Sequence, residues 1–177
     1  MIIGILGKKG VGKDTCADYI VQKYNYNKYS FAKPLKDICK ILFGFTNDQL
    51  YGNQKEVQDD FWKVTPRIAL QYIGTDLLRN QLNTIMPHIN QDIWVNVFKA
   101  NYKKDNIVIA DCRFQNEVDT IKEMGGIVIK LNRIMDNLVH DAHISEDIDN
   151  IINYDYEIHN DSTLGDLYKK IDNILSL

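Results

Sequence analysis

Proline and cysteine are scarce in this sequence, with three of each among 177 residues. Cys16, Cys39 and Cys112 are odd in number and far apart, so they indicate neither a disulfide framework nor a cysteine-based metal site. We expect reduced, partly buried thiols of an intracellular protein. The first residues also lack the basic leader and the small-residue cleavage site of a signal peptide. We therefore expect a core strand at the amino terminus and a cytoplasmic protein, located in the host cytoplasm if its source is viral.

Long hydrophobic runs and an excess of basic charge are missing as well. No apolar stretch approaches the roughly 20 residues that cross a bilayer, which argues against a membrane partner. The formal net charge of −3 argues against nucleic acid as the main partner, because proteins that bind it usually carry a strongly basic patch. Neither repeats nor low-complexity linkers occur. The length fits a single domain over residues 1–177, with small molecules as its ligands.

The sequence begins with an apolar stretch, residues 1–6, that runs directly into Gly7-Lys8-Lys9-Gly10-Val11-Gly12-Lys13. A glycine, four further residues and Gly-Lys form the frame of a phosphate-binding P-loop. Its glycines let successive N–H groups turn toward phosphate oxygens, and Lys13 would reach the β- and γ-phosphates of a nucleotide. Asp14 replaces the usual Ser or Thr after the lysine, and the hydroxyl follows at Thr15, so both are candidate magnesium ligands. A chance glycine turn ahead of a helix is the alternative.

Apolar runs and helical periodicity alternate along the chain. Strands are expected near residues 1–6, 29–32, 106–110, 127–131 and 156–159, and helices near 13–24, 33–44, 65–77, 93–98, 116–124 and 164–174. The second and third helices are expected to face inward with Leu35, Ile38, Cys39, Leu42, Ile68, Ala69, Tyr72, Ile73 and Leu77. The polar stretch 46–63 has no strong period and is expected to be mobile. This order predicts an α/β domain whose parallel sheet binds ligands at the carboxyl ends of its strands.

Charged side chains occur where this topology would place ligands. Asp111 follows the strand at 106–110, the usual place for a carboxylate that holds a nucleotide's magnesium or its water, although capping of the next helix is the alternative. The cations near strand ends exceed the needs of one nucleotide; they are Lys9, Lys36, Arg67, Arg79, Arg113 and Arg133. Two phosphorylated ligands facing each other would use them, as phosphoryl transfer between nucleotides requires. A solvated surface lysine is the alternative for Lys36.

A polar and aperiodic stretch covers residues 133–146. With Arg133 at its root and His140-Asp141-Ala142-His143 within it, we interpret it as a mobile lid that excludes water from the reaction. Two histidines three residues apart with acids nearby leave a metal site as the alternative.

Short motifs along the chain occur in the order found in one family. They are Gly12-Lys13-Asp14-Thr15, Phe31-Ala32-Lys33-Pro34-Leu35-Lys36, Leu70-Gln71-Tyr72-Ile73-Gly74-Thr75-Asp76, Trp94-Val95, Asp111-Cys112-Arg113, His143-Ile144-Ser145-Glu146 and Asn160-Asp161-Ser162. Through them the chain resembles, over nearly its whole length, the deoxynucleoside monophosphate kinases of the large tailed-phage type, which belong to the P-loop nucleoside monophosphate kinases. The resemblance implies a three-layer α/β/α fold with a central parallel sheet, an acceptor-binding region at about 31–95 and a mobile lid at about 133–146.

The resemblance also implies an activity, the ATP-dependent conversion of a deoxynucleoside monophosphate to its diphosphate for DNA synthesis, with Mg²⁺. Carried over by position, the ATP-binding residues would be Gly10, Gly12, Lys13, Asp14 and Thr15, with Asn160 in the turn beside the donor adenine. The acceptor site would be formed by Lys36, Arg67, Gly74, Thr75, Trp94, Arg113, Gln115 and Glu117. Catalysis would fall to Lys13, Lys9, Arg133 and Asp111. Asp111 could contact either the acceptor or the metal, where it would join Asp14 and Thr15.

Two alternatives remain open at this point. Another small-molecule kinase, such as one acting on dephospho-coenzyme A, would share the loop and the lid but would not need the surroundings of Trp94 and Gly74-Thr75. A non-catalytic nucleotide switch or regulatory ATPase belongs to a different class, and the lack of an Asn-Lys-x-Asp guanine motif counts against a GTPase. The chain lacks the long insertion that some relatives carry before Gln-x-x-Gly-Thr-Asp, which leaves base selection and a homodimer open.

Overall fold

The computed structural model describes residues 1–89, 91–134, 148 and 150–176 of the chain. The chain divides into two compact units. One comprises Met1–Ser30 together with Asn101–Leu177, and the other is the intervening segment Phe31–Ala100. The second unit covers nearly the same residues as the expected acceptor-binding region, while the expectation of a single domain stays a prediction.

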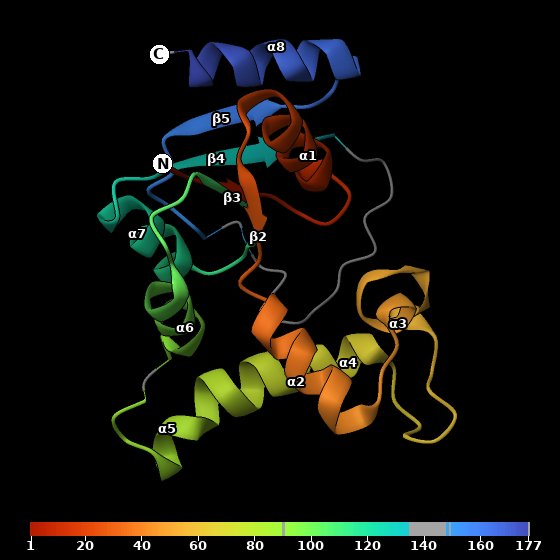
Figure 1. Cartoon of the computed structure of the whole chain (residues 1–177). Coiled ribbons are helices and arrows are strands. Elements are labelled where there is room, and N and C mark those ends of the chain that lie inside the picture. Colours follow the sequence, from red (N-terminus) through yellow and green to blue (C-terminus); the bar gives the residue numbers. More distant parts are fainter. Residues whose placement is uncertain (90, 135–147, 149, 177) are drawn as a thin grey trace. The chain divides into compact units, whose positions relative to one another are not determined.

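A parallel sheet forms the centre of the first unit. Its strands are β1 (Ile2–Leu6), β2 (Asn27–Tyr29), β3 (Ile107–Cys112), β4 (Ile127–Asn132) and β5 (Tyr156–His159). Among the described residues the order across the sheet is β2-β3-β1-β4-β5, and every pairing is parallel (Figure 1). All residues of the central strand β1 are buried, which explains why its sequence is apolar on both faces.

Helices cover both faces of this sheet. They are α1 (Lys13–Tyr24), α7 (Gln115–Glu123) and α8 (Leu164–Leu175). Helices α1 and α8 share one core with Ile3 and Ile5 of β1 (Figure 1). On the opposite face α7 approaches β1 closely, because a Cβ added at Gly4 would lie 2.7 Å from Cδ1 of Ile121. The three-layer α/β/α arrangement with a parallel sheet, expected from the sequence, is confirmed.

The strand order reverses at β1. After β1 the chain forms β2 and β3 on one side of it, and then crosses to β4 and β5 on the other side. In open parallel sheets, the carboxyl end of the strand at such a reversal is where ligands bind. The glycine-rich loop, residues 7–12, begins at this end of β1.

The second unit is helical in its described part. Its elements are α2 (Lys33–Phe43), α3 (Asn47–Tyr51), the 3-10 helix η1 (Asn53–Glu56), α4 (Pro66–Gln71), the π-helix η2 (Tyr72–Gln81), α5 (Leu82–Ile85) and α6 (Ile93–Asn101). Gly44, with φ of 69°, ends α2 in the left-handed conformation, as its sequence predicts. The unit has its own apolar core, made by Leu35, Cys39, Phe45, Leu50, Ala69 and Trp94.

The expectation of a mobile segment at 46–63 is wrong, because this stretch contains α3 and η1. Thr46 and Gln49 form a reciprocal capping box, in which each side chain bonds the other residue's backbone N–H. Leu50 is fully buried beneath the short helix. One cap and one buried leucine are enough to fix a helix of this length, and neither produces a visible period.

The second strand lies two residues earlier than expected, at Asn27–Tyr29 rather than 29–32. Asn27 donates its N–H to the carbonyl of Asn106 and pairs with Ile107, so the ladder begins directly after the turn at Asn25. Ser30 then bonds the side chain of Asp111 instead of continuing the ladder.

The expected inward faces of two helices are partly wrong. In α2, Leu35 and Cys39 are buried, but Ile38 and Leu42 are exposed. Along α4 and η2 the buried side includes Ala69, Gly74, Thr75 and Arg79, whereas the exposed side includes Ile68, Tyr72 and Leu77. A π-helix has wider turns than the 3.6-residue repeat on which the expectation rested, so it brings different positions inward.

Candidate active site

The loop between β1 and α1 has the backbone conformation that its glycines predict. Gly10 and Gly12 have φ of 85° and 103°, in the left-handed region that side chains disfavour. Gly12 is also the N-cap residue of α1. Gly7 is packed closely, because a Cβ there would lie 2.6 Å from the carbonyl oxygen of Leu131. The loop therefore presents the start of a helix and its N–H groups, which suit an anion such as phosphate.

Lys13 lies against this loop. Its ammonium donates hydrogen bonds to the carbonyls of Gly7 and Lys8, at 2.6 and 2.7 Å. The positive charge is thus held by the loop that would bind phosphates. Lys9, in contrast, is exposed on the same loop.

Asp14 and Thr15 occupy the first turn of α1, and both are exposed. Oδ1 of Asp14 lies 3.0 Å from the ammonium of Lys28, which also pairs with Asp18 at 2.9 Å. The negative charge at the usual Ser or Thr position is therefore balanced by a lysine from β2. The spacing of residues in the sequence could not have revealed this pairing between α1 and β2.

Asp111 is half-buried at the carboxyl end of β3, where it was expected, although β3 continues through Cys112. Ser30, just after β2, donates its hydroxyl to Oδ2 of Asp111 at 2.6 Å. Ser30 follows β2, and Asp111 lies in the last residues of the neighbouring parallel strand β3, so they meet at the same edge of the sheet. Ser30 was missed by sequence reasoning, because the strand expected at 29–32 placed it inside the strand and not directly after it.

The turn after β5 contacts two other parts of the first unit. The side-chain amide of Asn160 donates to the carbonyl of Val11 in the glycine-rich loop, at 2.9 Å. The carboxylate of Asp161 accepts the backbone N–H of Ile134, at 2.6 Å. Sequence reasoning related Asn160 only to the donor adenine and assigned no role to Asp161.

The first turn of α7 carries two residues that the resemblance relates to the acceptor. Glu117 is 3% exposed, and its carboxylate accepts the backbone N–H groups of Arg113 and Phe114, at 2.8 and 3.2 Å. The side chain of Gln115 bonds both backbone groups of Ile152, at 2.8 and 3.0 Å. These contacts hold the protein's own backbone and fix the position from which Arg113 extends.

In the second unit the structure brings Gly74 and Trp94 together. The indole N–H of Trp94 donates to the carbonyl of Gly74 at 2.9 Å, and a Cβ at Gly74 would lie 2.4 Å from Cδ2 of Leu35. Thr75 is buried beside them on η2, at 5% exposure. The remaining expected acceptor residues of this unit lie on other helices.

Those residues are Arg67 on α4 and Lys36 on α2. The side chain of Arg67 is 14% exposed, with Nε 3.8 Å from a carboxylate oxygen of Glu56. The ammonium of Lys36 lies 4.1 Å from the ring centre of Tyr51, a cation–π arrangement. Lys36 is thus not simply a solvated lysine.

Arg133 is exposed, immediately after β4. The lid expected at 133–146 lies otherwise outside the described residues, together with His140 and His143 and the metal site considered there. Within the part of the chain that the structure describes, no group of three or more His, Cys, Asp or Glu side chains is arranged to hold a metal ion. Among the helices of that part, none has the length and hydrophobicity to cross a bilayer.

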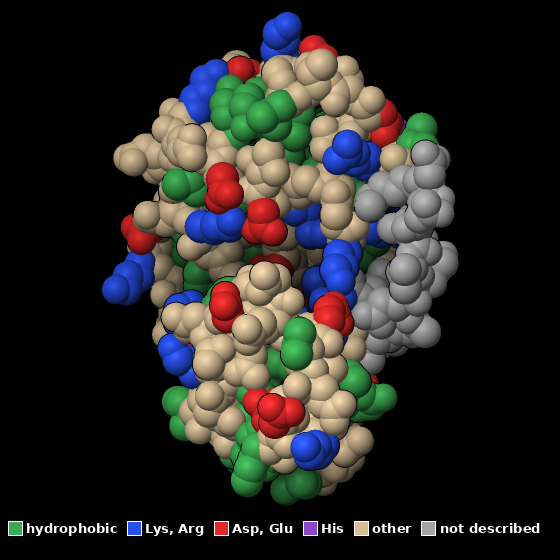
Figure 2. Space-filling model, turned by 90° about the vertical axis from the view of Figure 1, so that its right-hand side faces the viewer, with side chains coloured by type: hydrophobic (Ala, Val, Ile, Leu, Met, Phe, Trp, Pro, Cys, Tyr) green, Lys and Arg blue, Asp and Glu red, His purple; other side chains and the backbone are tan. Residues whose placement is uncertain are grey.

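Burial makes the cysteines poor nucleophiles. It raises the pKa of the Cys16 thiol to about 12 and that of Cys39 to about 11. It also raises the pKa of the fully buried Cys112 well above its ordinary value, assisted by the charges of Glu117 and Asp111. All three are free thiols, as expected from the sequence, but they are buried and not partly buried. Figure 2 shows acidic and basic side chains intermixed on the face that it draws.

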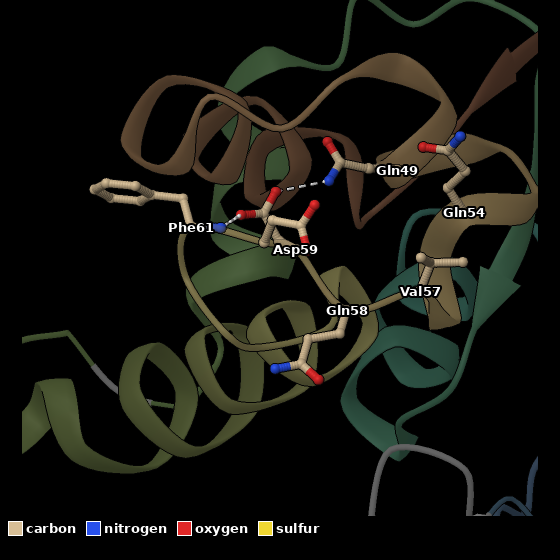
Figure 3. Close-up of a pocket in the computed structure, with 7 residues that line it drawn as sticks. Gln49, Gln54, Val57, Gln58, Asp59 and Phe61 are labelled. Atoms are coloured by element: carbon tan, nitrogen blue, oxygen red, sulfur yellow. Dashed lines mark hydrogen bonds between the residues drawn. The ribbon is translucent and has the colours of Figure 1, made fainter.

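A surface hollow of about 380 Å³ lies in the second unit, lined by Gln49, Gln54, Val57, Gln58, Asp59, Asp60 and Phe61. Asp59 organises it by accepting hydrogen bonds from the side chain of Gln49 and the backbone N–H of Phe61, at 2.9 and 3.0 Å (Figure 3). None of the site residues expected from the sequence lines this hollow. We therefore base the candidate site on the glycine-rich loop and the carboxyl ends of the strands.

Comparisons with known proteins agree on one family. A family model described as deoxynucleotide monophosphate kinase matches residues 1–64 and 45–171. A putative deoxynucleotide monophosphate kinase of Acanthamoeba polyphaga mimivirus is 42% identical over 182 residues, which covers 97% of this chain and 94% of that protein. The deoxynucleotide monophosphate kinase of Enterobacteria phage T4 is 27% identical over 246 aligned positions, covering 99% of each. Since that alignment exceeds 177 residues, the phage protein contains additional residues.

Solved structures support the fold. Dephospho-CoA kinase from Campylobacter jejuni matches with a TM-score of 0.51 at 15% identity, covering 99% of this chain and 95% of that chain. Shikimate kinase from Aquifex aeolicus matches with a TM-score of 0.50 at 14% identity, covering 99% and 96%. At such low identity these likenesses concern the α/β/α architecture alone.

Proposed function

The chain belongs to the deoxynucleotide monophosphate kinase family, and on this premise we propose that it transfers the γ-phosphoryl group of ATP to a deoxynucleoside 5′-monophosphate. The products would be the deoxynucleoside diphosphate and ADP, and the diphosphate would supply DNA synthesis. The observation that carries the proposal is the glycine-rich loop, with its left-handed Gly10 and Gly12 and the ammonium of Lys13 at the carboxyl end of β1. The family matches do not favour the two alternatives left open by the sequence.

The first unit would bind the donor. N–H groups of the loop, including those of Gly10 and Gly12, would bind the phosphate oxygens, and the amino end of α1 adds a favourable dipole. Lys13 would exchange its bonds to loop carbonyls for bonds to the β- and γ-phosphates, where it offsets the negative charge that develops during transfer. Two further cations would bring positive charge close to the transferred group. They are Lys9, exposed on the same loop, and Arg133, after β4.

Oxygen ligands for Mg²⁺ are present in the same unit. Magnesium prefers oxygen donors, and the hydroxyl of Thr15 and the carboxylate of Asp111 both fit this requirement. Asp14 would contact the ion through a water molecule or not at all, because its carboxylate forms an ion pair with Lys28. When bound, the ion would neutralise part of the negative charge on the donor phosphates.

The second unit would bind most of the acceptor. Arg67 offers a fixed guanidinium that suits the monophosphate, and Lys36 offers a second cation. Trp94 would act by holding the backbone of Gly74, with Thr75 next to it. In the first unit, Glu117 accepts from the backbone N–H of Arg113, and Gln115 bonds the backbone of Ile152, so of these three side chains Arg113 is the one that we propose for the acceptor.

A coupled assay of ADP formation with a panel of monophosphates and with dephospho-coenzyme A tests the proposal. We expect turnover with one or more deoxynucleoside monophosphates and none with dephospho-coenzyme A. ATP hydrolysis that does not depend on an acceptor would instead indicate the regulatory ATPase. A chain that turns over none of the monophosphates would contradict the proposed function.

Lys13→Ala is the sharpest variant for the same assay. Loss of its charge should lower kcat by roughly 100-fold or more, the size seen when one donor to a developing negative charge is removed. The circular dichroism spectrum should stay unchanged, because the side chain is not part of either apolar core. Lys169→Ala, an exposed lysine on α8, is the matched control and should keep full activity. Near-normal turnover of Lys13→Ala would remove the P-loop from the mechanism.

A further inference from the structure

Asn160 makes a contact with the glycine-rich loop that the donor-binding role alone does not explain. Its side-chain amide donates to the carbonyl oxygen of Val11 at 2.9 Å, across 149 residues of sequence. Val11 is 3% exposed, and Asn160 is half-buried, so this bond is partly shielded from water. A partly shielded hydrogen bond between distant segments restrains both of them.

The bond fixes the direction of the next N–H group. The peptide that joins Val11 to Gly12 is planar and trans, so its C=O and N–H point in opposite directions. When Asn160 holds the carbonyl of Val11 on one side, the N–H of Gly12 must point to the other side. Gly12 itself has φ of 103°, and a glycine can adopt several other backbone conformations unless a contact holds its peptide.

The fit between these residues is close. A Cβ added at Gly12 would lie 2.8 Å from Nδ2 of Asn160. The glycine is required by its backbone conformation, and a side chain in its place would have to displace the amide of Asn160. A loop that merely passes near Asn160 would leave more space.

Asn160 is in turn held firmly from its own side. Its backbone N–H donates to the carbonyl of Asn132 at the end of β4, at 2.8 Å. The preceding carbonyl, that of His159, accepts from the ammonium of Lys170 on α8 at 2.6 Å. Asn160 thus connects the glycine-rich loop to two elements of the rigid sheet and helix layer.

We propose that Asn160 is a positioning residue of the phosphate loop, which orients the N–H of Gly12 toward the donor phosphates whatever base the donor carries. This inference rests on the proposed function, since it concerns the same donor site. It differs from the expected place of Asn160 beside the donor adenine, because a base contact would act on adenine nucleotides alone. An N–H donor that already points toward the phosphate site strengthens binding, because little conformational entropy is lost when the anion binds.

The test measures donor binding with and without a base. Tripolyphosphate binding is followed by calorimetry, and KM is measured for ATP, for GTP and for the monophosphate acceptor. In Asn160→Ala we expect the Kd of tripolyphosphate and the KM of both triphosphates to rise together, by roughly tenfold, as loss of one hydrogen bond and of loop order implies. The KM of the acceptor should stay within about twofold of wild type.

Asn160→Asp keeps the size of the side chain and guards against failure of the alanine variant to fold. Its carboxylate oxygens cannot donate to the carbonyl of Val11, so its donor constants should be at least as weak as those of Asn160→Ala. Asn106→Ala is the matched control, because Asn106 also makes a long-range side-chain bond, to the amino group of Met1, at the amino end of β3. It should leave all four constants unchanged.

The outcomes separate the inference from the proposed function. A loss confined to ATP, with tripolyphosphate and GTP unaffected, would assign Asn160 to the adenine and overturn the inference. Variants indistinguishable from wild type would overturn it as well. A wild-type protein that neither binds tripolyphosphate nor transfers phosphate would overturn the proposed function, and the inference with it.

Discussion

Ser30 shows how one hydroxyl can orient a carboxylate of the proposed site. It donates to Oδ2 of Asp111 at 2.6 Å, from the neighbouring strand end of the same unit. This bond fixes the rotation of the carboxylate, whose oxygens are the kind of ligand that a magnesium ion prefers. Ser30 would therefore matter to the reaction without touching a nucleotide.

We predict that Ser30→Ala raises the Mg²⁺ concentration needed for half-maximal activity by about tenfold, in line with measured effects of groups that orient metal ligands. Ser30→Thr retains the hydroxyl and should restore most of the affinity. A magnesium titration of kcat/KM measures this effect. Ser176→Ala, which removes a hydroxyl at the end of α8, is the control. An unchanged magnesium requirement in Ser30→Ala would show that Asp111 is not a ligand of the ion.

Among the elements, α1 and α8 are joined by a polar cluster centred on Asp172. Tyr19, Lys23 and Tyr24 of α1 all donate hydrogen bonds to its carboxylate, at 2.7 to 3.0 Å. The ring of Tyr19 also stacks on that of Tyr168 of α8, with centroids 3.8 Å apart. These contacts lie outside the apolar core of the two helices and fix how α8 sits on α1.

The bonds from Lys23, and then those from Tyr24 and Tyr19, hold the pKa of Asp172 below its ordinary value of 3.8. A carboxylate whose pKa is lowered by folding stabilises the folded state above its unfolded pKa, and this contribution is lost as the pH falls through the folded value. We predict that Asp172→Asn lowers Tm by a few degrees at neutral pH.

Thermal unfolding of wild type and Asp172→Asn between pH 2 and pH 8 checks this. The difference in Tm should be constant above about pH 5 and should shrink below about pH 4. A difference that persists unchanged in acid would mean that the side chain acts through packing rather than through its charge.

The elements that the sequence predicts well are those whose signal is local. β1, the glycine-rich loop and the start of α1 are contiguous. Their residue types directly reflect the burial of β1 on both faces and the left-handed conformation of the loop glycines. The π-helix η2 could not be predicted, because its apolar residues have the spacing of an ordinary helix and the contacts of Gly74 are with Leu35 and Trp94, which lie on other helices. The turn at Asn160 could be placed but its partner could not, since 149 residues separate it from Val11.

At the scale of the whole molecule, the expected donor residues lie in the first unit and most of the expected acceptor residues lie in the second, with Arg113, Gln115 and Glu117 as the exceptions. The glycine-rich loop, Thr15 and Asp111 belong to the first unit, whereas Lys36, Arg67 and Trp94 belong to the second. Each ligand should therefore leave its mark mainly on one unit when it binds alone.

Hydrogen exchange with mass spectrometry measures this division. We predict that a non-hydrolysable ATP analogue slows exchange in peptides covering residues 7–15, and that a deoxynucleoside monophosphate slows exchange in peptides covering α4 and η2. Peptides of α8 serve as the internal control and should respond little to either ligand. Protection of α4 and η2 by the donor analogue alone would contradict the assignment of the acceptor to the second unit.

The outermost strands of the sheet also bear on how copies of the chain meet. β2 and β5 are three and four residues long, and they carry Lys28 and Glu157 exposed at their centres. Short, charged borders are poor templates for strand addition, which protects a parallel sheet from growing through neighbouring molecules during synthesis or at high concentration. A homodimer of this chain, which the sequence left open, would therefore be built from contacts between side-chain surfaces and not by extending the backbone ladder from one copy into the next.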